Sequence, residues 1–398
     1  MRVSAVLMRG GTSKGLFIHE SDLPTDPRLR DAFILAAYGS PDPYGRQTDG
    51  VGGGTSVTSK LAIVGDGRPY GVDVTYEFGQ VAIDRPLVDR RGTCGNMSTA
   101  IGPFAIEEGL VEATGPITAV RILNTNTNKV VVAYVPTPNG SYDPVGEHRI
   151  PGVGGTGSAV RIDYLDPAGS VSGALFPTGN PKDVLEVEGV GSVEVSIVDA
   201  ANPLVFVRWE AFGLDGTEPP ERIDADPELL HRVEAVRASA AVAAGLASTT
   251  DEATRLSPSI PKLAFVGRPV AYRLTDGTEQ AAAETTVRAA TMSMGRMHRS
   301  FPVTGALCLA VAAKAGATIV AEVSDEGDTA RIGHPSGVTA ATAEVTPSGD
   351  GWDVARAGVY STARRLMEGT VVVPDELVEA LRSEVISPVG RPQVDTRG

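Results

Sequence analysis

The sequence has few aromatic residues, few cysteines and no long apolar run. Aromatic residues make up 5% of the 398 residues, and the two cysteines are Cys94 and Cys308. Two cysteines do not form a disulfide framework, and neither lies among residues with metal-ligand spacing. The longest apolar run, 306–313, is far shorter than a membrane span, and the apolar patch within 1–11 is too short for a signal peptide. We therefore expect a soluble cytoplasmic protein with no metal.

Positive charge is also scarce. The chain has 35 Lys and Arg against 49 Asp and Glu, which gives a net charge of −14. This balance argues against nucleic acid and anionic membrane surfaces as partners. An anionic substrate would need a local positive site. We expect a small-molecule partner and leave a homodimer open.

Glycine and proline are abundant instead, with 46 and 28 residues, which suits many short strands and turns. Alternation of apolar and polar residues predicts strands at 3–7, 57–64, 72–76, 120–123, 130–135, 159–164, 193–198 and 204–208. Asp226 and Pro227 form a typical helix start, and the Ala-rich stretch after them continues to Leu246.

Two further segments, 96–108 and 304–314, are apolar on nearly all faces and predict buried helices. Pro103 should kink or split the first. One mostly buried helix in each half, amid many strands, predicts an α+β fold in which strands wrap around a central helix. The turn-rich stretch 177–183 predicts a domain boundary.

Small polar residues precede each of these buried helices, in 93–98 and 302–306. The first amides of a helix are unpaired and the helix dipole is positive there, so two such starts could bind two carboxylates of one acid. The segment 55–60 adds Lys60 as a base beside Cys94. Of two Gly-rich segments, 152–157 leads into a strand, which argues against dinucleotide binding. The other, 49–55, is either a tight turn or a set of amides close to a ligand.

The chain resembles the PrpF family in nine motifs that occur in order between about residues 1 and 373. They are 8–15, 49–60, 94–97, 124–127, 166–170, 199–203, 257–262, 293–295 and 333–337. The family includes 2-methylaconitate cis-trans isomerase, 4-oxalomesaconate tautomerase and methylitaconate isomerase. The resemblance implies a diaminopimelate epimerase-like fold of two pseudo-symmetric domains, each a barrel-like sheet around a central helix, with the site in the cleft between them. The domains would be 1–183 and 184–398, and the segment from about 365 to 398 either stays in the second or returns to the first.

The resemblance also implies a catalytic pair. In epimerases of this fold, each domain supplies one cysteine at its helix start. Cys94 matches the first, but Pro302 occupies the position of the second, so the two-thiol arrangement is broken. The PrpF family has a lysine that maps to Lys60. Lys60 would therefore act as the base, with Cys94 assisting.

Each member of the pair has a structural alternative. Burial of Lys60 in an apolar strand would disfavour its charged form, but lone strand lysines more often lie on a solvated face. Cys94 stands near Arg90 and Arg91, a setting that favours a thiolate, whereas most free cysteines are inert core residues. Cys308, in an apolar helix, is predicted to be such a core residue. Arg90 and Arg91 also depart from the family pattern, which leaves the exact substrate open.

The resemblance implies substrate contacts from both domains. The first domain would contribute Thr12, Ser13, Lys14, Thr55, Ser56, Gly95, Asn96 and Met97. The second would contribute Ser293, Met294, Gly295, Thr304 and Gly305, and also His298, which is either a ligand or a packing histidine.

The favoured interpretation is a cofactor-independent isomerase of unsaturated di- or tricarboxylic acids of the aconitate, methylaconitate or oxalomesaconate type. It would work by a 1,3-allylic proton shift or a cis-trans change. Two rivals remain: an amino-acid racemase or epimerase on the same fold, and a non-catalytic accessory protein of an aconitase-like enzyme.

Overall fold

The computed structural model describes residues 1–349 and 351–386. The chain divides into two compact units. Unit 1 comprises Met1–Arg149, Gly155–Ile162 and the segment from Ser361, and unit 2 comprises Ile150–Gly154 and Asp163–Tyr360. Residues 163–183 thus belong to unit 2, whereas the sequence placed them in the first domain. They join it because the loop after residue 165 is bonded to Asp199, whose carboxylate accepts hydrogen bonds from Ser170 Oγ at 2.5 Å and Val171 N at 2.8 Å.

Unit 1 is a mixed sheet wrapped around one helix, α2 (Gly95–Glu107). Its strands are β1 (Arg2–Gly10), β2 (Ser13–His19), β3 (Lys60–Asp66), β4 (Val74–Val81), β5 (Val88–Asp89), β6 (Ile117–Asn124), β7 (Lys129–Pro136) and β20 (Ala363–Val372), and β8 (Val160–Leu165) begins there. They pair in the order β20–β1–β2–β3–β4–β6–β7. α2 packs against all seven of these strands, and all its residues up to Ile106 are buried. The helix runs unbroken through Pro103, so the predicted split is wrong.

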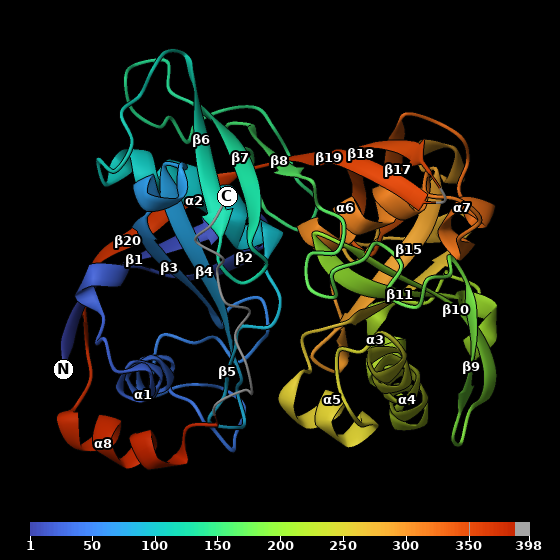
Figure 1. Ribbon diagram of the computed structural model, residues 1–398, viewed down its shortest axis with the longest axis horizontal. Coiled ribbons are helices and arrows are strands. Elements are labelled where there is room, and N and C mark those ends of the chain that lie inside the picture. Colours follow the sequence, from blue (N-terminus) through green and yellow to red (C-terminus); the bar gives the residue numbers. More distant parts are fainter. Residues whose placement is uncertain (350, 387–398) are drawn as a thin grey trace. The chain divides into compact units, whose positions relative to one another are not determined.

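Two more helices cover unit 1 on the side away from α2. They are α1 (Pro27–Tyr38) and α8 (Asp375–Glu384), which lie side by side (Figure 1). The Asp26 carboxylate caps α1 by accepting from Arg28 N at 2.9 Å, and Gly39, at φ +70°, ends the helix. α1 packs in one core cluster with Leu61 and Ile63 of β3.

Unit 2 is built around α6 (Val303–Ala312), which packs against β10, β11, β17 and β18. Its strands are β9 (Asp183–Val187), β10 (Gly191–Ala200), β11 (Asn202–Arg208), β12 (Lys262–Gly267), β13 (Tyr272–Arg273), β14 (Glu279–Gln280), β15 (Val287–Ser293), β16 (Arg296–Met297), β17 (Thr329–His334), β18 (Gly337–Ser348) and β19 (Gly351–Ser361). Its other helices are α3 (Pro220–Asp224), α4 (Pro227–Ala243), α5 (Thr250–Leu256) and α7 (Ile319–Val323). As predicted, Asp226 caps α4, accepting from Leu229 N at 2.9 Å.

The two units repeat one topology. In unit 1 the strands β1–β2–β3–β4–β6–β7 pair antiparallel, parallel, antiparallel, parallel and antiparallel. In unit 2 the strands β10–β11–β12–β15–β17–β18 pair in the same sequence. In each unit the buried helix comes between the fourth and fifth strands of this series. This repeat confirms the prediction of two pseudo-symmetric domains, each wrapped around a central helix.

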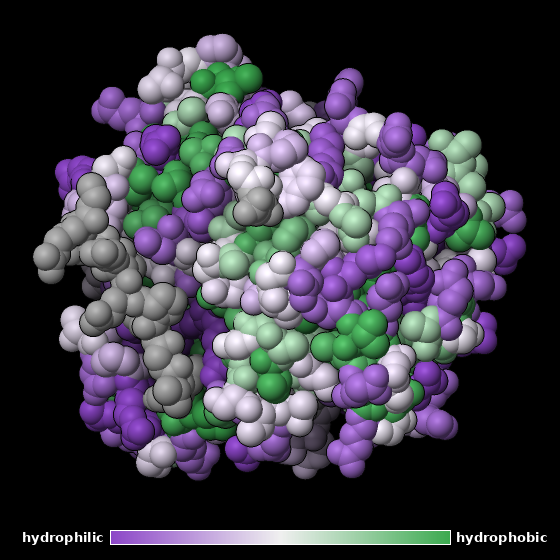
Figure 2. Space-filling model, turned by 45° about the vertical axis from the view of Figure 1, so that its right-hand side comes forward, coloured by the Kyte–Doolittle hydropathy of each residue, from purple (hydrophilic) through white to green (hydrophobic). Residues whose placement is uncertain are grey.

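The outer surface mixes polar and apolar residues. On the face that Figure 2 shows, apolar residues lie in separate groups among polar ones, as is usual for folded proteins. Among the described residues, no helix has both the length and the apolar character needed to cross a membrane.

Candidate active site

Lys60 begins β3 and is 8% exposed. Successive side chains of a strand point to opposite faces, and Leu61 and Ile63 pack towards α1. Lys60 therefore points to the other face. Ala62 lies on the same face of β3 as Lys60, and its partner on β2 is Phe17, whose ring lies 5.5 Å from that of Phe104 in α2. The Lys60 side chain thus lies on the face of the sheet that α2 covers, which excludes the alternative of a solvated strand lysine.

A neutral amide holds the Lys60 amine. Lys60 pairs with Gln80 in the antiparallel β3–β4 register, and Nζ donates to Gln80 Oε1 at 2.7 Å. Nζ also lies 5.1 Å from the centre of the Phe78 ring. The sequence analysis missed Gln80, because the contact depends on the register of two strands.

The main chain at Lys60 is fixed as well. The Tyr38 hydroxyl, at the end of α1, donates to the Lys60 carbonyl and accepts from Leu16 N at 3.0 Å. Burial raises the pKa of the Tyr38 phenol, which keeps it a neutral donor. Gly15 lies opposite Lys60 on β2, and a Cβ there would lie 1.9 Å from the Lys60 carbonyl oxygen and 3.0 Å from Met97 Cε. Lys60 and the first turn of α2 therefore both border Gly15.

Cys94 is the N-cap residue of α2 and is half-buried. Its carbonyl accepts from Ser98 N at 2.9 Å, which closes the first turn. The amides of Gly95, Asn96 and Met97 precede that bond and have no acceptor within the helix. The thiol caps none of the described amides. Cys308, by contrast, is fully buried in α6, and burial raises its pKa, as a core cysteine requires.

Asn96 joins the start of α2 to the turn between β1 and β2. Its Nδ2 donates to Thr12 Oγ1 at 3.0 Å and to Ser13 Oγ at 3.2 Å. A Cβ at Gly11 would lie 2.1 Å from Asn96 Oδ1, so the approach requires glycine. The next residue, Lys14, donates its amide to Val57 O at 2.9 Å. Hydrogen bonds thus join three of the predicted substrate contacts, Thr12, Ser13 and Asn96.

The segment 55–59 is a turn, not the start of a strand as predicted. Thr58 N donates to Thr55 O at 3.1 Å, and the two hydroxyls lie 2.8 Å apart. Gln80 Nε2 donates to Ser56 O at 3.2 Å, which ties this turn to the partner of Lys60. Just upstream, a Cβ at Gly50 would lie 2.2 Å from Gly39 N. This close packing against the end of α1 favours the tight-turn interpretation of 49–55.

Arg90 is paired with two carboxylates. Its guanidinium donates to Asp31 Oδ1 at 2.6 Å and to Glu77 Oε1 at 2.7 Å. Burial lowers the pKa of Arg90, but the two carboxylates raise it further, so the net shift is upward. The Arg90 carbonyl accepts from Asn126 Nδ2 at 2.8 Å. The Asn126 side chain also accepts from Phe78 N and donates to Phe78 O. Two carboxylates of unit 1 thus balance the charge of Arg90, and its influence on the Cys94 thiol stays a prediction.

In unit 2, Thr304 and Gly305 lie in the first turn of α6, as predicted. Pro302 is the N-cap residue of α6, the place that Cys94 has in α2. A Cβ at Gly305 would lie 3.2 Å from the Phe301 ring, so packing already explains this glycine.

The other predicted contacts in unit 2 form a hairpin. Ser293 pairs with Arg296, and Met294 and Gly295, both with positive φ, make the two-residue turn that such pairing favours. Met294 and Gly295 line a cavity of about 20 Å³ with α4, too small for a polycarboxylic acid. His298 is buried, and its Nδ1 lies 2.8 Å from Ser300 O, which favours the packing alternative.

The topological repeat adds one residue that the sequence analysis did not select as a contact. Lys262 begins β12 as Lys60 begins β3, and its Nζ donates to Ser259 O at 2.7 Å.

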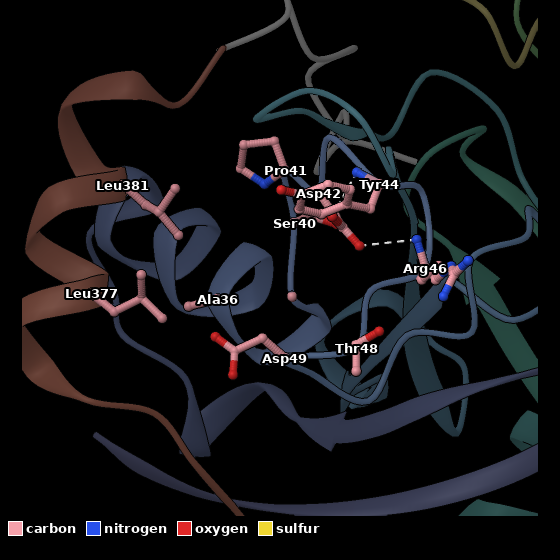
Figure 3. Close-up of a pocket in the computed structure, with 11 residues that line it drawn as sticks. Ala36, Ser40, Pro41, Asp42, Tyr44, Arg46, Thr48, Asp49, Leu377 and Leu381 are labelled. Carbon is pink, nitrogen blue, oxygen red and sulfur yellow. Dashed lines mark hydrogen bonds between the residues drawn. The ribbon is translucent and has the colours of Figure 1, made fainter.

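In unit 1, a cavity of about 720 Å³ opens between the end of α1 and α8 (Figure 3). Leu377 and Leu381 line it on the α8 side, and none of the predicted contacts lines it. Within residues 1–349 and 351–386, no cluster of His, Cys, Asp and Glu could hold a metal ion.

Comparison with known proteins places the chain in one family. The family described as PrpF protein matches residues 1–374. YraM of Bacillus subtilis (strain 168) is 45% identical over 372 residues, which cover 93% of this chain and 97% of that protein. The 3-methylitaconate isomerase of Eubacterium barkeri is 42% identical over 377 residues, with coverage of 94% and 97%. The 2-methyl-aconitate isomerase of Shewanella oneidensis is 38% identical over 387 residues, with coverage of 94% and 97%.

Solved structures agree with this placement. The crystal structure of methylitaconate-delta-isomerase has a TM-score of 0.77 and 40% identity, and covers 99% of both chains. A hydroxyproline epimerase from Agrobacterium vitis has a TM-score of 0.53 at 13% identity, with coverage of 95% and 94%, which shows the fold alone. The predicted epimerase-like fold is therefore confirmed. The chain belongs to the PrpF family.

Proposed function

We propose that this protein is a cofactor-independent isomerase of unsaturated di- or tricarboxylic acids, with Lys60 as base and Cys94 assisting. The observation that carries the proposal is the buried Lys60 amine on the α2 face, bonded to an amide. Relatives that are named isomerases of 3-methylitaconate and 2-methyl-aconitate support the substrate class. A cytoplasmic location and a homodimer stay predictions.

The reaction is a proton shift along an allyl system. The Lys60 amine, in its unprotonated form, takes a proton from a saturated carbon beside a double bond. The released electron pair spreads over the adjacent double bond and carboxylate as a dienolate. Lys60, now an ammonium, returns the proton at the far carbon, and the double bond is left one position along. If the Cys94 thiol returns a proton instead, the Lys60 ammonium reprotonates the thiolate before the next turnover. No atom is gained or lost.

The start of α2 would stabilise the intermediate. The amides of Gly95, Asn96 and Met97, which have no acceptor within the helix, lie at the helix end where the dipole is positive. Such fixed donors stabilise charge that develops on an oxygen. Thr12 and Ser13, held by Asn96, would bind a carboxylate, and the α6 start with Thr304 and Gly305 would bind a second. The remaining predicted contacts, Lys14, Thr55, Ser56, Ser293, Met294 and Gly295, complete the proposal, which omits His298 because its ring is held against Ser300.

Deuterium wash-in tests the proposal. Itaconate- and aconitate-type acids are incubated with the protein in D2O and followed by proton NMR, alongside proline and diaminopimelate followed by chiral chromatography. We expect enzyme-dependent exchange at an allylic carbon of at least one acid and no racemisation. Racemisation of the amino acids without exchange of any acid would instead favour the epimerase. Binding of an acid without exchange would favour the accessory protein.

A further inference from the structure

We propose that Gln80 is the positioning residue of the Lys60 amine, which it holds by a neutral hydrogen bond. The inference rests on the proposed function of Lys60 as base. Gln80 lies directly opposite Lys60 in the β3–β4 pair, is 4% exposed, and accepts from Nζ at 2.7 Å. Lysine has four rotatable side-chain bonds, so a fixed acceptor is what confines Nζ to one place.

Two main-chain carbonyls hold the Gln80 amide in its orientation. Its Nε2 donates to Ser59 O at 3.0 Å and to Ser56 O at 3.2 Å. Both partners are carbonyl oxygens, which only accept, so the amide nitrogen must face them. The amide oxygen must then face Lys60. The same two bonds tie the base to the turn that carries Thr55 and Ser56, two of the predicted substrate contacts.

The neutrality of this partner matters for the chemistry. A base must begin as a free amine, become an ammonium when it takes the proton, and return. A carboxylate at the same place would favour the ammonium and oppose the first step. An amide oxygen accepts from the amine and from the ammonium alike, so the bond persists through the cycle. The Phe78 ring accommodates the charged form at the moment when it arises.

Two variants test the inference by deuterium exchange across pH. Gln80→Met keeps the size of the side chain and removes the acceptor. We expect its kcat for exchange to fall about 10- to 100-fold, the cost of a misplaced group, with a smaller change in KM. Gln80→Glu supplies a negative charge that stabilises the ammonium, so more alkaline solution is needed to free the amine. We expect the acidic limb of its pH–rate profile to move up by about one unit.

Controls separate this inference from the proposed function. Gln280→Met is the matched control, because Gln280 is a buried glutamine of β14 that donates to Glu284 in unit 2. It should leave exchange unchanged. Lys60→Ala is run alongside. Exchange that survives in a folded Lys60→Ala would overturn the proposed function. A different result would overturn only the positioning role of Gln80. In that case Lys60→Ala loses exchange, but folded Gln80→Met exchanges within about twofold of the unmodified protein. The acidic limb of the pH–rate profile of Gln80→Glu also stays where it is in the unmodified protein.

A measurement on the unmodified protein covers the case in which the Gln80 variants do not fold. The chain has six lysines, so labelling with ¹⁵N-lysine gives few Nζ signals. The Lys60 signal is the one that disappears in Lys60→Ala. Because Nζ is buried and bonded to Gln80, its protons should exchange with water more slowly than those of the other five lysines, which are all partly exposed. Exchange as fast as theirs would overturn the inference.

Discussion

Replacing Arg90 by methionine should lower stability strongly and leave the chemistry of the folded protein intact. The Arg90 side chain is 11% exposed and forms ion pairs with Asp31 and Glu77, which are 12% and 16% exposed. Methionine fills much of the same volume but removes the cation that pairs with both buried carboxylates. Breaking a buried pair from one side typically costs 3–5 kcal/mol. We expect the free energy of unfolding to fall by about 4 kcal/mol.

Urea unfolding followed by circular dichroism measures this change, and deuterium exchange per folded molecule measures the activity. Adding Asp31→Asn to the variant should restore part of the stability, because it removes one uncompensated charge. Arg68→Met is the control, because Arg68 forms an exposed ion pair with Asp66. The change in its free energy of unfolding should lie within the scatter of the measurement. An Arg90→Met protein of unchanged stability but reduced exchange would refute the reasoning, because it would place Arg90 at the reacting site.

Three further predictions follow from buried groups. Tyr38→Phe leaves the Lys60 carbonyl and the Leu16 amide without their shared partner, and urea unfolding should show a loss of about 1–3 kcal/mol. Iodoacetamide should modify Cys94 before Cys308 in peptide maps, and the reverse order would contradict the core assignment of Cys308. Burial lowers the pKa of His334 to about 3, so stability should fall as pH drops below the ordinary histidine value of 6.5. Between about pH 7 and 5, the free energy of unfolding of His334→Gln should therefore fall by about 2 kcal/mol less than that of the unmodified protein.

Local signals predicted much of the fold. The Asp226-Pro227 pair located the start of α4, and the all-round apolar character of 96–108 and 304–314 identified the two central helices. The same kind of signal, Asp26-Pro27, opens α1, a helix that the sequence analysis did not predict. β3 begins at Lys60 instead of residue 57, because the turn 55–59 is closed by its own hydrogen bonds.

The site was less accessible to sequence reasoning, since its geometry depends on contacts between distant segments. Gln80 meets Lys60 only through strand register, and Tyr38 reaches Lys60 from a helix on the other face. Arg90 is close to Cys94 in the sequence, but its side chain is drawn to Asp31, far away in the chain. Adjacency in sequence therefore did not reveal the carboxylate partners of Arg90.

The central claim is that Lys60 moves the proton, and one measurement tests it directly. The acid that exchanges fastest with the unmodified protein is incubated with Lys60→Ala in D2O, and folding is confirmed by circular dichroism. Lys314→Ala serves as the control, because Lys314 binds only main-chain carbonyls at the far end of α6 among the described residues. We predict that exchange falls at least ~10²-fold in Lys60→Ala, the scale of positioned acid–base catalysis, and stays normal in Lys314→Ala. Near-normal exchange by folded Lys60→Ala would contradict the account.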